Sequence, residues 1–285
     1  MRWATRFTRS STTQPHRGEI TRTRGGFMRI DNEVYQTYGH EWWSENAGFN
    51  VFSLRYCMNP VRYGYFKRKL RELRLPGGTI LDVGCGGGLL AEEFARDGFA
   101  VTGIDPATRS LEAARKHAAD TNLEIDYREG KGEALPFPDG SFDIVACCDV
   151  LEHVDDLGLV IGEVARTLRA GGVFCYDTVN RTWFSKLALI KISQDWGFTS
   201  WSKPNVHVWE KFIKPAELIA VMNRCGLANQ ELRGISARRN PLALIAGLHA
   251  LKKGRLSNRE MAAVFALRES EDLRASYMGY AVKSR

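Results

Sequence analysis

The chain has 285 residues, of which 44% are hydrophobic and 26% are charged, as in an ordinary globular protein. No apolar run is long enough to span a bilayer. A chain of this length can bury a full core, so its fold requires neither disulfides nor a structural metal. The formal net charge of +7 permits contact with nucleic acid, an anionic membrane or an acidic substrate.

Residues 1–27 are rich in Arg, Ser, Thr and Gly and lack apolar periodicity, which is typical of a disordered segment. An Arg-rich, acid-poor leader of this kind is compatible with a transit peptide. The alternative is that translation starts at Met28 and that the leader is a start-site artefact. We favour this alternative because the sequence after Met28 begins like a folded protein, and we expect a single domain over residues 28–285.

Residues 28–75 are predicted to be helical and strongly aromatic, with a helix starting at Asn59-Pro60. Beyond them, short apolar runs alternate with helical patterns. Ala170-Gly171-Gly172 is expected to end the last of these helices, which runs through Leu168. Strands are predicted at 79–83, 100–104, 124–128, 142–147 and 173–178. Alternation of this length predicts a parallel sheet with right-handed crossovers, and residues 76–180 are its core.

The pattern changes in the third region, residues 181–285. We expect helices at 183–192 and 214–225, a loop at 197–209, strands at 230–236 and 275–282, and a basic helical insertion at 238–265. The predicted fold is therefore α/β, with a doubly wound, seven-stranded, mostly parallel sheet. A helical N-terminal lid precedes the sheet, and a helical insertion lies near its C-terminal end.

The segment after the first strand has the composition of a nucleotide-binding turn. Gly84, Gly86 and Gly88 let the backbone approach a ligand closely, and the N-terminus of the next helix points at it. Asp105 ends the second strand, about 20 residues further on, where a carboxylate accepts hydrogen bonds from ribose hydroxyls. These features alone fit both NAD and S-adenosylmethionine.

Later motifs separate the two cofactors. The segments GEALPFPDGSFDIVACCDVLEHVDD and VARTLRAGGVF resemble the corresponding motifs of class I S-adenosylmethionine-dependent methyltransferases, which have a Rossmann-like fold. Glu41-Trp42-Trp43, Asn59-Pro60-x-Arg62, DVLEHV and KFIKPAEL resemble more closely the ubiquinone-biosynthesis O-methyltransferase family. This resemblance extends from about residue 34 to residue 283. It implies S-adenosylmethionine as cofactor and a prenylated phenol or catechol as acceptor.

The resemblance also implies which residues contact the cofactor. Arg62 suits the methionine carboxylate because a guanidinium binds a carboxylate through two hydrogen bonds. Cys148 would contribute backbone or packing around the adenine, and the loop 133–136 lies where the family holds the adenine. The full set of expected cofactor contacts is Arg62, Gly84, Gly86, Gly88, Asp105, Glu133, Ala134 and Cys148.

The family carries an acidic-x-x-Glu-His signature that is reported to bind a divalent cation in some members. Here it is Asp149, Glu152 and His153. If a helix starts at Asp149, positions i, i+3 and i+4 share one face and could hold Mg²⁺ or Zn²⁺. The alternative is metal-free general-base catalysis by His153, or by His207 in the segment NVHVWEKF.

Two other functions stay open. The first is C- or N-methyl transfer in specialised metabolism, because residues 238–265 depart most from the resembled family. The second is a non-catalytic cofactor-binding scaffold of a biosynthetic complex. We expect a cytoplasmic protein that acts on a hydrophobic small molecule and does not bind nucleic acid. The sequence does not indicate an oligomeric state. Basic residues near two apolar helices favour peripheral contact with anionic lipid: Lys186, Lys191, Lys252, Lys253 and Arg255.

Overall fold

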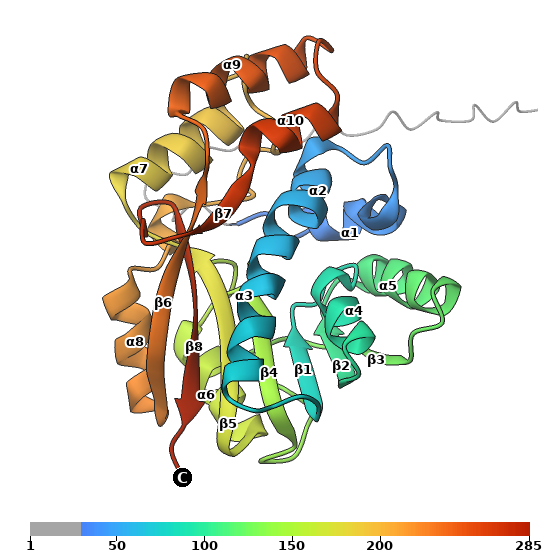
Figure 1. Ribbon diagram of the computed structural model, residues 1–285, viewed down its shortest axis with the longest axis vertical. Coiled ribbons are helices and arrows are strands. Elements are labelled where there is room, and N and C mark those ends of the chain that lie inside the picture. Colours follow the sequence, from blue (N-terminus) through green and yellow to red (C-terminus); the bar gives the residue numbers. More distant parts are fainter. Residues whose placement is uncertain (1–29) are drawn as a thin grey trace, which may run out of the picture.

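The computed structural model describes residues 30–285, so the predictions for residues 1–27 lie outside the described residues. A single eight-stranded sheet runs through the molecule in the order β3-β2-β1-β4-β5-β8-β6-β7 (Figure 1). Its strands are β1 Thr79–Val83, β2 Ala100–Asp105, β3 Ile125–Glu129, β4 Phe142–Cys148, β5 Leu168–Val179, β6 Leu227–Ala237, β7 Leu267–Ser270 and β8 Ser276–Lys283.

The strand order confirms the doubly wound sheet. Strands β3, β2, β1, β4 and β5 are parallel, and the direction of winding reverses between β1 and β4. Ligands in such sheets bind outside the carboxyl ends of the strands at this point. The antiparallel strands β8, β6 and β7 complete the sheet.

The expected number of strands is wrong by one. The additional strand is β7, whose sequence Leu-Arg-Glu-Ser has no apolar alternation of its own. It lies at the edge of the sheet and pairs with β6 over four residues, from Leu267 to Ser270. Because its pairing depends on a neighbouring strand, the segment has no strand signal that can be read in isolation.

Helices cover both faces of the sheet. One face packs against α3 Asn59–Glu72, α4 Leu89–Arg96 and α5 Thr108–Asp120, and the other packs against α6 Leu157–Thr167 and α8 Pro215–Arg224. Alternate residues of β1 show the division, since Ile80 belongs to the first core and Leu81 to the second. No helix within residues 30–285 is long and apolar enough to cross a membrane.

The remaining helices gather above the carboxyl ends of the parallel strands, at the top of Figure 1. They are α1 Val34–Tyr38, η1 Gly39–Trp43, α2 Phe49–Ser53, η2 Leu54–Met58, α7 Trp183–Ser185, η3 Lys186–Asp195, α9 Pro241–Lys252 and α10 Asn258–Phe265. The short helix η4 Trp209–Lys211 adjoins α7, where Trp209 stacks on Trp183. Phe49 of α2 packs with Leu248 and Met261, so the N-terminal helices and the insertion form one layer. The predicted helical insertion is confirmed as the pair α9 and α10.

Two helical segments of this upper layer are wound as π-helices: η3, and η2 at Leu54–Met58. Asn59 donates its backbone N–H to the carbonyl of Leu54, five residues earlier. The predicted helix start at Asn59-Pro60 is confirmed as the start of α3, with Pro60 in its first turn. The sequence did not indicate that the chain is already helical before Asn59, because the π turn of η2 leads directly into α3.

The helix before β5 ends one residue earlier than predicted, and Ala170-Gly171-Gly172 does not form its end. The helix α6 ends at Thr167, and Leu168 is already extended and pairs with Phe142. Gly171 has a φ of +74°, as expected of a left-handed residue, but it lies within β5, not at the helix end. The LRAGG segment therefore forms the irregular first part of β5.

Candidate functional site

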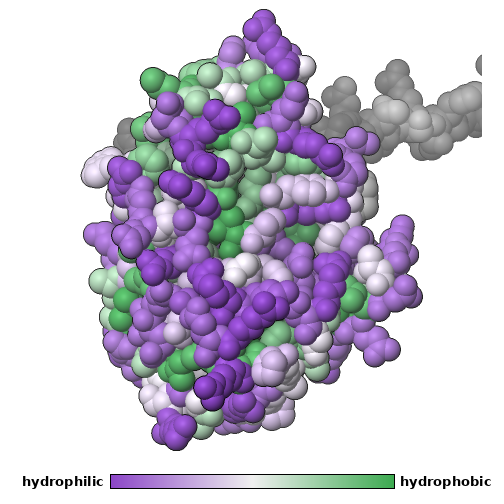
Figure 2. Space-filling model, viewed as in Figure 1, coloured by the Kyte–Doolittle hydropathy of each residue, from purple (hydrophilic) through white to green (hydrophobic). Residues whose placement is uncertain are grey.

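A cavity of about 1500 Å³ opens at the carboxyl ends of the parallel strands. Its lower wall comes from the ends of β1, β2 and β4, and its upper wall comes from the helices of the upper layer. Figure 2 shows hydrophobic side chains in a hollow in the upper half of the molecule, bordered by hydrophilic ones. Because typical ligand pockets have volumes of about 300–1000 Å³, this cavity has room for two ligands side by side.

The glycine turn reaches the cavity at two of its three predicted positions. Gly84 and Gly86 line it and have φ values of +71° and +52°, which favour glycine. Gly88 also has a positive φ, but it lies outside the cavity lining, and a Cβ there would overlap the Tyr127 hydroxyl. Gly88 is therefore required by packing at the start of α4.

Asp105 lies in the cavity wall and holds two loops together. Its Oδ2 accepts the backbone N–H of Gly86 at 2.9 Å, and its Oδ1 accepts that of Ala107 at 2.7 Å. Burial raises the pKa of this carboxyl, while the two hydrogen bonds act in the opposite direction. The carboxylate is thus fixed beside the glycine turn, where a ribose would lie, and its role toward the ribose stays a prediction.

Of the three residues predicted to lie near the adenine, two line the cavity and one does not. Cys148 ends β4 and lies buried in the cavity wall. Glu133 also lines the cavity and accepts the backbone N–H of Asp155 at 3.1 Å. Ala134 is exposed and is not among the residues that line the cavity.

Two tryptophans from η1 close the turn from above, as the predicted lid would. The Trp42 ring lies against Gly86 and Gly87, and its Nε1 donates to Ser110 Oγ at 2.9 Å. Trp43 donates its Nε1–H to the carbonyl of Gly87 at 2.8 Å. Sequence reasoning assigned the glycines to the ligand alone and missed that one of them makes room for an indole.

Arg62 lies buried between two carboxylates of the chain itself. Its guanidinium is 2.5 Å from Asp149 and 3.2 Å from Asp177, and its Nε has no partner among the described residues. Burial lowers the pKa of Arg62, but the charges of Asp149 and Asp177 outweigh it and the net pKa is raised. The side chain lines the cavity as a fixed cation, and its contact with a methionine carboxylate stays a prediction.

The helix expected to start at Asp149 is absent, and this prediction is wrong. Asp149 has a φ of +54°, and the chain turns until α6 begins at Leu157. Asp156 caps that helix by accepting the N–H groups of Gly158 and Leu159. The argument that residues at i, i+3 and i+4 share a helix face therefore fails, and Asp149 is turned toward Arg62.

A different trio meets at the cavity. Glu152, His153 and His207 each place a possible ligand atom within 4.8 Å of the other two. Thr178 donates to Glu152 Oε2 at 2.7 Å. Within the described part of the chain, Glu152 Oε1 and the Nδ1 atoms of both histidines have no hydrogen-bond partner. His207 thus takes the place that sequence reasoning had given to Asp149.

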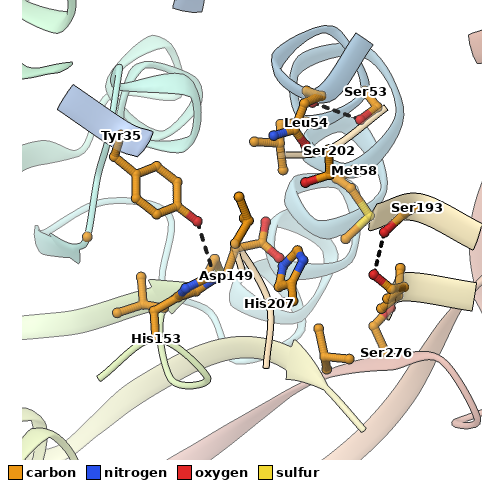
Figure 3. A pocket seen from close by; sticks show the side chains of 18 of the residues that line it. Tyr35, Ser53, Leu54, Met58, Asp149, His153, Ser193, Ser202, His207 and Ser276 are labelled. Carbon is orange, nitrogen blue, oxygen red and sulfur yellow. Dashed lines mark hydrogen bonds between the residues drawn. The ribbon is translucent and has the colours of Figure 1, made fainter. Parts of the chain in front are cut away.

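Tyr35 joins this trio from the N-terminal helix α1. Its hydroxyl lies 3.2 Å from His153 Nε2, and Figure 3 shows Tyr35 pointing to His153 with His207 beside it. The sequence showed Tyr35 only as one of many aromatic residues in a helical segment, so no signal marked it as a site residue. The contact depends on tertiary structure, because α1 packs against α5 and Asn32, just before α1, donates to the carbonyl of His153 at 3.1 Å.

Burial controls the protonation of this group. It lowers the pKa of His153 to about 3, with His207 adding to the effect, and it lowers the pKa of His207 to about 4. Burial and then the charge of Asp149 raise the pKa of Glu152. At neutral pH both imidazoles are therefore uncharged, and each keeps a free lone pair.

Comparison with known proteins shows the family to which the chain belongs. A family described as methyltransferase domain matches residues 81–176. The ubiquinone biosynthesis O-methyltransferase of Azorhizobium caulinodans is 35% identical over 210 residues, which cover 70% of this chain and 81% of the relative. That of Actinobacillus pleuropneumoniae is 39% identical over 207 residues, which cover 71% and 86%.

Solved structures give the same fold. An S-adenosylmethionine-dependent methyltransferase from Thermotoga maritima has a TM-score of 0.54 at 19% identity and covers 88% of this chain and 99% of its own. A methyltransferase from Galdieria sulphuraria has a TM-score of 0.60 at 16% identity, with coverages of 89% and 99%. The chain belongs to the ubiquinone biosynthesis O-methyltransferase family and is an S-adenosylmethionine-dependent methyltransferase.

Proposed function

We propose that the protein transfers the methyl group of S-adenosylmethionine to a phenol or catechol oxygen of a prenylated quinone precursor. The observation that carries this proposal is the group of Glu152, His153 and His207, whose two histidines line the same cavity as the glycine turn and Asp105. The names of the relatives support the choice of oxygen as acceptor atom.

The reaction is an in-line displacement at a sulfonium, whose positive charge disperses in the transition state. Alignment and exclusion of water are then the main tasks of the protein. An acceptor hydroxyl beside the trio can donate its hydrogen bond to an unpartnered imidazole nitrogen of His153 or His207. This contact directs an oxygen lone pair toward the methyl group. Imidazoles with pKa values of about 3 and 4 orient the hydroxyl before transfer. As the O–C bond forms and the S–C bond breaks, the phenolic proton passes to the imidazole and S-adenosylhomocysteine leaves.

The trio also fits a divalent cation. Two neutral imidazoles and one carboxylate form the set that zinc uses in catalytic sites, whereas Mg²⁺ prefers oxygen ligands only. The unpartnered Glu152 Oε1 and histidine Nδ1 atoms are free to serve as ligands. We therefore assign a candidate Zn²⁺ site to Glu152, His153 and His207, without Asp149. A cation bound there would lower the pKa of a phenolic oxygen.

We also propose that the upper layer touches an anionic membrane. Large apolar side chains are exposed there, with Trp183 77% and Leu242 78% accessible. Lys186 lies 5.2 Å from the centre of the Trp183 ring, which places a cation next to an apolar group. Aromatic and basic side chains in this combination suit the boundary between lipid head groups and acyl chains.

The test is methyl transfer from labelled S-adenosylmethionine to a short-chain prenylated catechol, a simple phenol and an indole. We expect label on the catechol, because the relatives are named as ubiquinone biosynthesis O-methyltransferases. Transfer to the indole alone would favour C- or N-methylation. Cofactor binding without transfer to any of the three would favour the scaffold interpretation.

A further inference from the structure

The loop that carries His207 folds back onto the last turn of the π-helix η3. Three consecutive residues of this turn bind the loop, each at a different point. Thr199 donates its hydroxyl to the carbonyl of Ile192 at 2.8 Å, and Ser202 donates its backbone N–H to the carbonyl of Ser193 at 3.0 Å. Thr199 and Ser193 are 1% and 2% exposed, so water hardly reaches these contacts. The path of the loop therefore depends on the end of η3.

Gln194, the third of these residues, holds His207 itself. Its side-chain Oε1 accepts the backbone N–H of His207 at 2.7 Å, and its Nε2 donates to the backbone carbonyl of His207 at 3.1 Å. A primary amide offers an acceptor and a donor side by side, so it can satisfy both polar groups of one residue. Gln194 is buried, and loss of its amide would leave both backbone groups of His207 without these partners.

The residues on either side of His207 restrict its backbone further. Val206 and Val208 are both buried in the protein. Between them, the imidazole of His207 lines the cavity, and its centre lies 5.3 Å from that of the His153 ring (Figure 3). The place of this imidazole in the catalytic trio is thus set by packed neighbours and by an amide from η3.

Gln194 itself stays behind the wall of the cavity. In the part of the chain that the structure describes, Ile192 and Ser193 line the cavity and Gln194 does not. The turn that presents Gln194 is π-helical, since Trp196 donates its N–H to the carbonyl of Lys191, five residues earlier, at 2.8 Å. Such turns are rare and occur frequently at functional sites. Gln194 can therefore act on a bound acceptor only through His207.

We infer that Gln194 is a positioning residue for methyl transfer, which holds the imidazole of His207 where it can bind the acceptor hydroxyl. The inference rests on the proposed function, because it takes His207 to act on the acceptor. Both hydrogen bonds of the Gln194 amide go to His207, not to the glycine turn or Asp105. Its loss should therefore reduce turnover and leave cofactor binding unchanged, because a small misplacement of a catalytic group already slows the reaction.

The experiment compares two substitutions of Gln194 with a short-chain prenylated catechol as acceptor. In Gln194→Leu, which removes both bonds, kcat should fall by about 10- to 100-fold, while the Kd for S-adenosylmethionine stays within about twofold by calorimetry. Gln194→Glu keeps an acceptor for the His207 N–H and should recover part of the lost kcat. Gln230→Leu is the matched control, because Gln230 is exposed on β6 and bonds only to the nearby carbonyl of Ala228.

A second measurement follows the position of His207 without turnover. Diethylpyrocarbonate modifies accessible imidazoles, and His207 Nδ1 is buried. In Gln194→Leu, modification of His207 should become faster by mass spectrometry, while His117 on α5 reacts as in wild type and serves as internal reference.

The two measurements distinguish the possible failures. If His207 reacts faster in Gln194→Leu but His207→Ala turns over like wild type, only the proposed role of His207 in transfer fails. If His207→Ala loses turnover while Gln194→Leu keeps it, only the inference about Gln194 fails. Equal losses of kcat, cofactor affinity and unfolding midpoint in both Gln194 variants would also overturn the inference, because they would show that this residue only supports the fold.

Discussion

The indole of Trp42 occupies the space that a side chain at position 87 would need. A Cβ built at Gly87 would overlap the Cγ and Cβ of Trp42, and the carbonyl of Gly87 accepts the indole N–H of Trp43. The shape of the glycine turn is thus matched to the two indole rings that cover it.

Gly87→Ala should displace Trp42 and destabilise the fold by about 1–3 kcal/mol, because the added methyl group overpacks the contact. The unfolding midpoint and the affinity for S-adenosylmethionine should both fall, as measured by calorimetry. Gly162→Ala is the control, since no atom lies near its Cβ position in α6. Equal stability of the two variants would show that Trp42 can move aside freely.

Asp105→Ala should weaken cofactor binding by about tenfold or more, because it removes an acceptor for ribose hydroxyls and frees the N–H groups of Gly86 and Ala107. Isothermal titration with S-adenosylmethionine measures the effect. Asp126→Ala removes an exposed carboxylate on β3 that pairs with Arg128, and it should bind the cofactor like wild type. Unchanged affinity in Asp105→Ala would remove this residue from the cofactor site.

Tyr35→Phe should lower kcat by about two- to tenfold while cofactor affinity stays the same, because one hydrogen bond to His153 is lost. Steady-state kinetics with the preferred acceptor tests this. Tyr56→Phe removes a hydroxyl that bonds to the exposed Glu45 and should behave like wild type. A kcat for Tyr35→Phe that equals wild type would mean that the tyrosine only packs.

Removal of metal by a chelator should distinguish metal-assisted methyl transfer from metal-free orientation of the acceptor by the histidines. If the trio holds a cation, EDTA abolishes turnover and Zn²⁺ restores it better than Mg²⁺. His207→Ala should lose the bound metal, measured as metal per chain by mass spectrometry, whereas Asp149→Asn should retain it, because Asp149 faces Arg62. Full turnover in EDTA would leave metal-free orientation by the histidines.

Replacing Trp183 and Leu242 together by glutamate should reduce flotation with phosphatidylglycerol vesicles, because both side chains are exposed at the upper layer. Binding of wild type should weaken as salt concentration rises. Leu73→Glu is the control, since Leu73 is 38% exposed at the other end of the molecule, after α3. Equal flotation of all three proteins would argue against a membrane face at the upper layer.

Much of the fold could be predicted from the sequence, because its elements have strong local patterns. The parallel strands around Ile80 and Val145 are short, mainly apolar runs. A helix follows each of β1, β2 and β4, whereas β3 is joined to β4 by a loop. Gly84 and Asp105 were singled out because short motifs place them at strand ends, and Arg62 was singled out by the family resemblance. The structure brings all three to one cavity.

The remainder depends on contacts that no local pattern records. Asp149 adopts a left-handed conformation where a helix was expected, since Asp177 and Arg62 hold it in a turn. His207 comes to the catalytic trio from a loop more than fifty residues away in sequence. Such long-range partners follow from packing, so spacing alone suggested Asp149 in place of His207.

The upper layer has a consequence for the order of events in a catalytic cycle. Phe49, which belongs to the predicted lid, packs edge-on against Phe265 of the insertion, and Asn258 donates to the carbonyl of Ala47 at 2.8 Å. The predicted lid is thereby joined to insertion helices that line the same cavity. If the spent cofactor leaves past this lid, its exit disturbs those helices, so we expect compulsory-order kinetics in which the methylated product departs before S-adenosylhomocysteine.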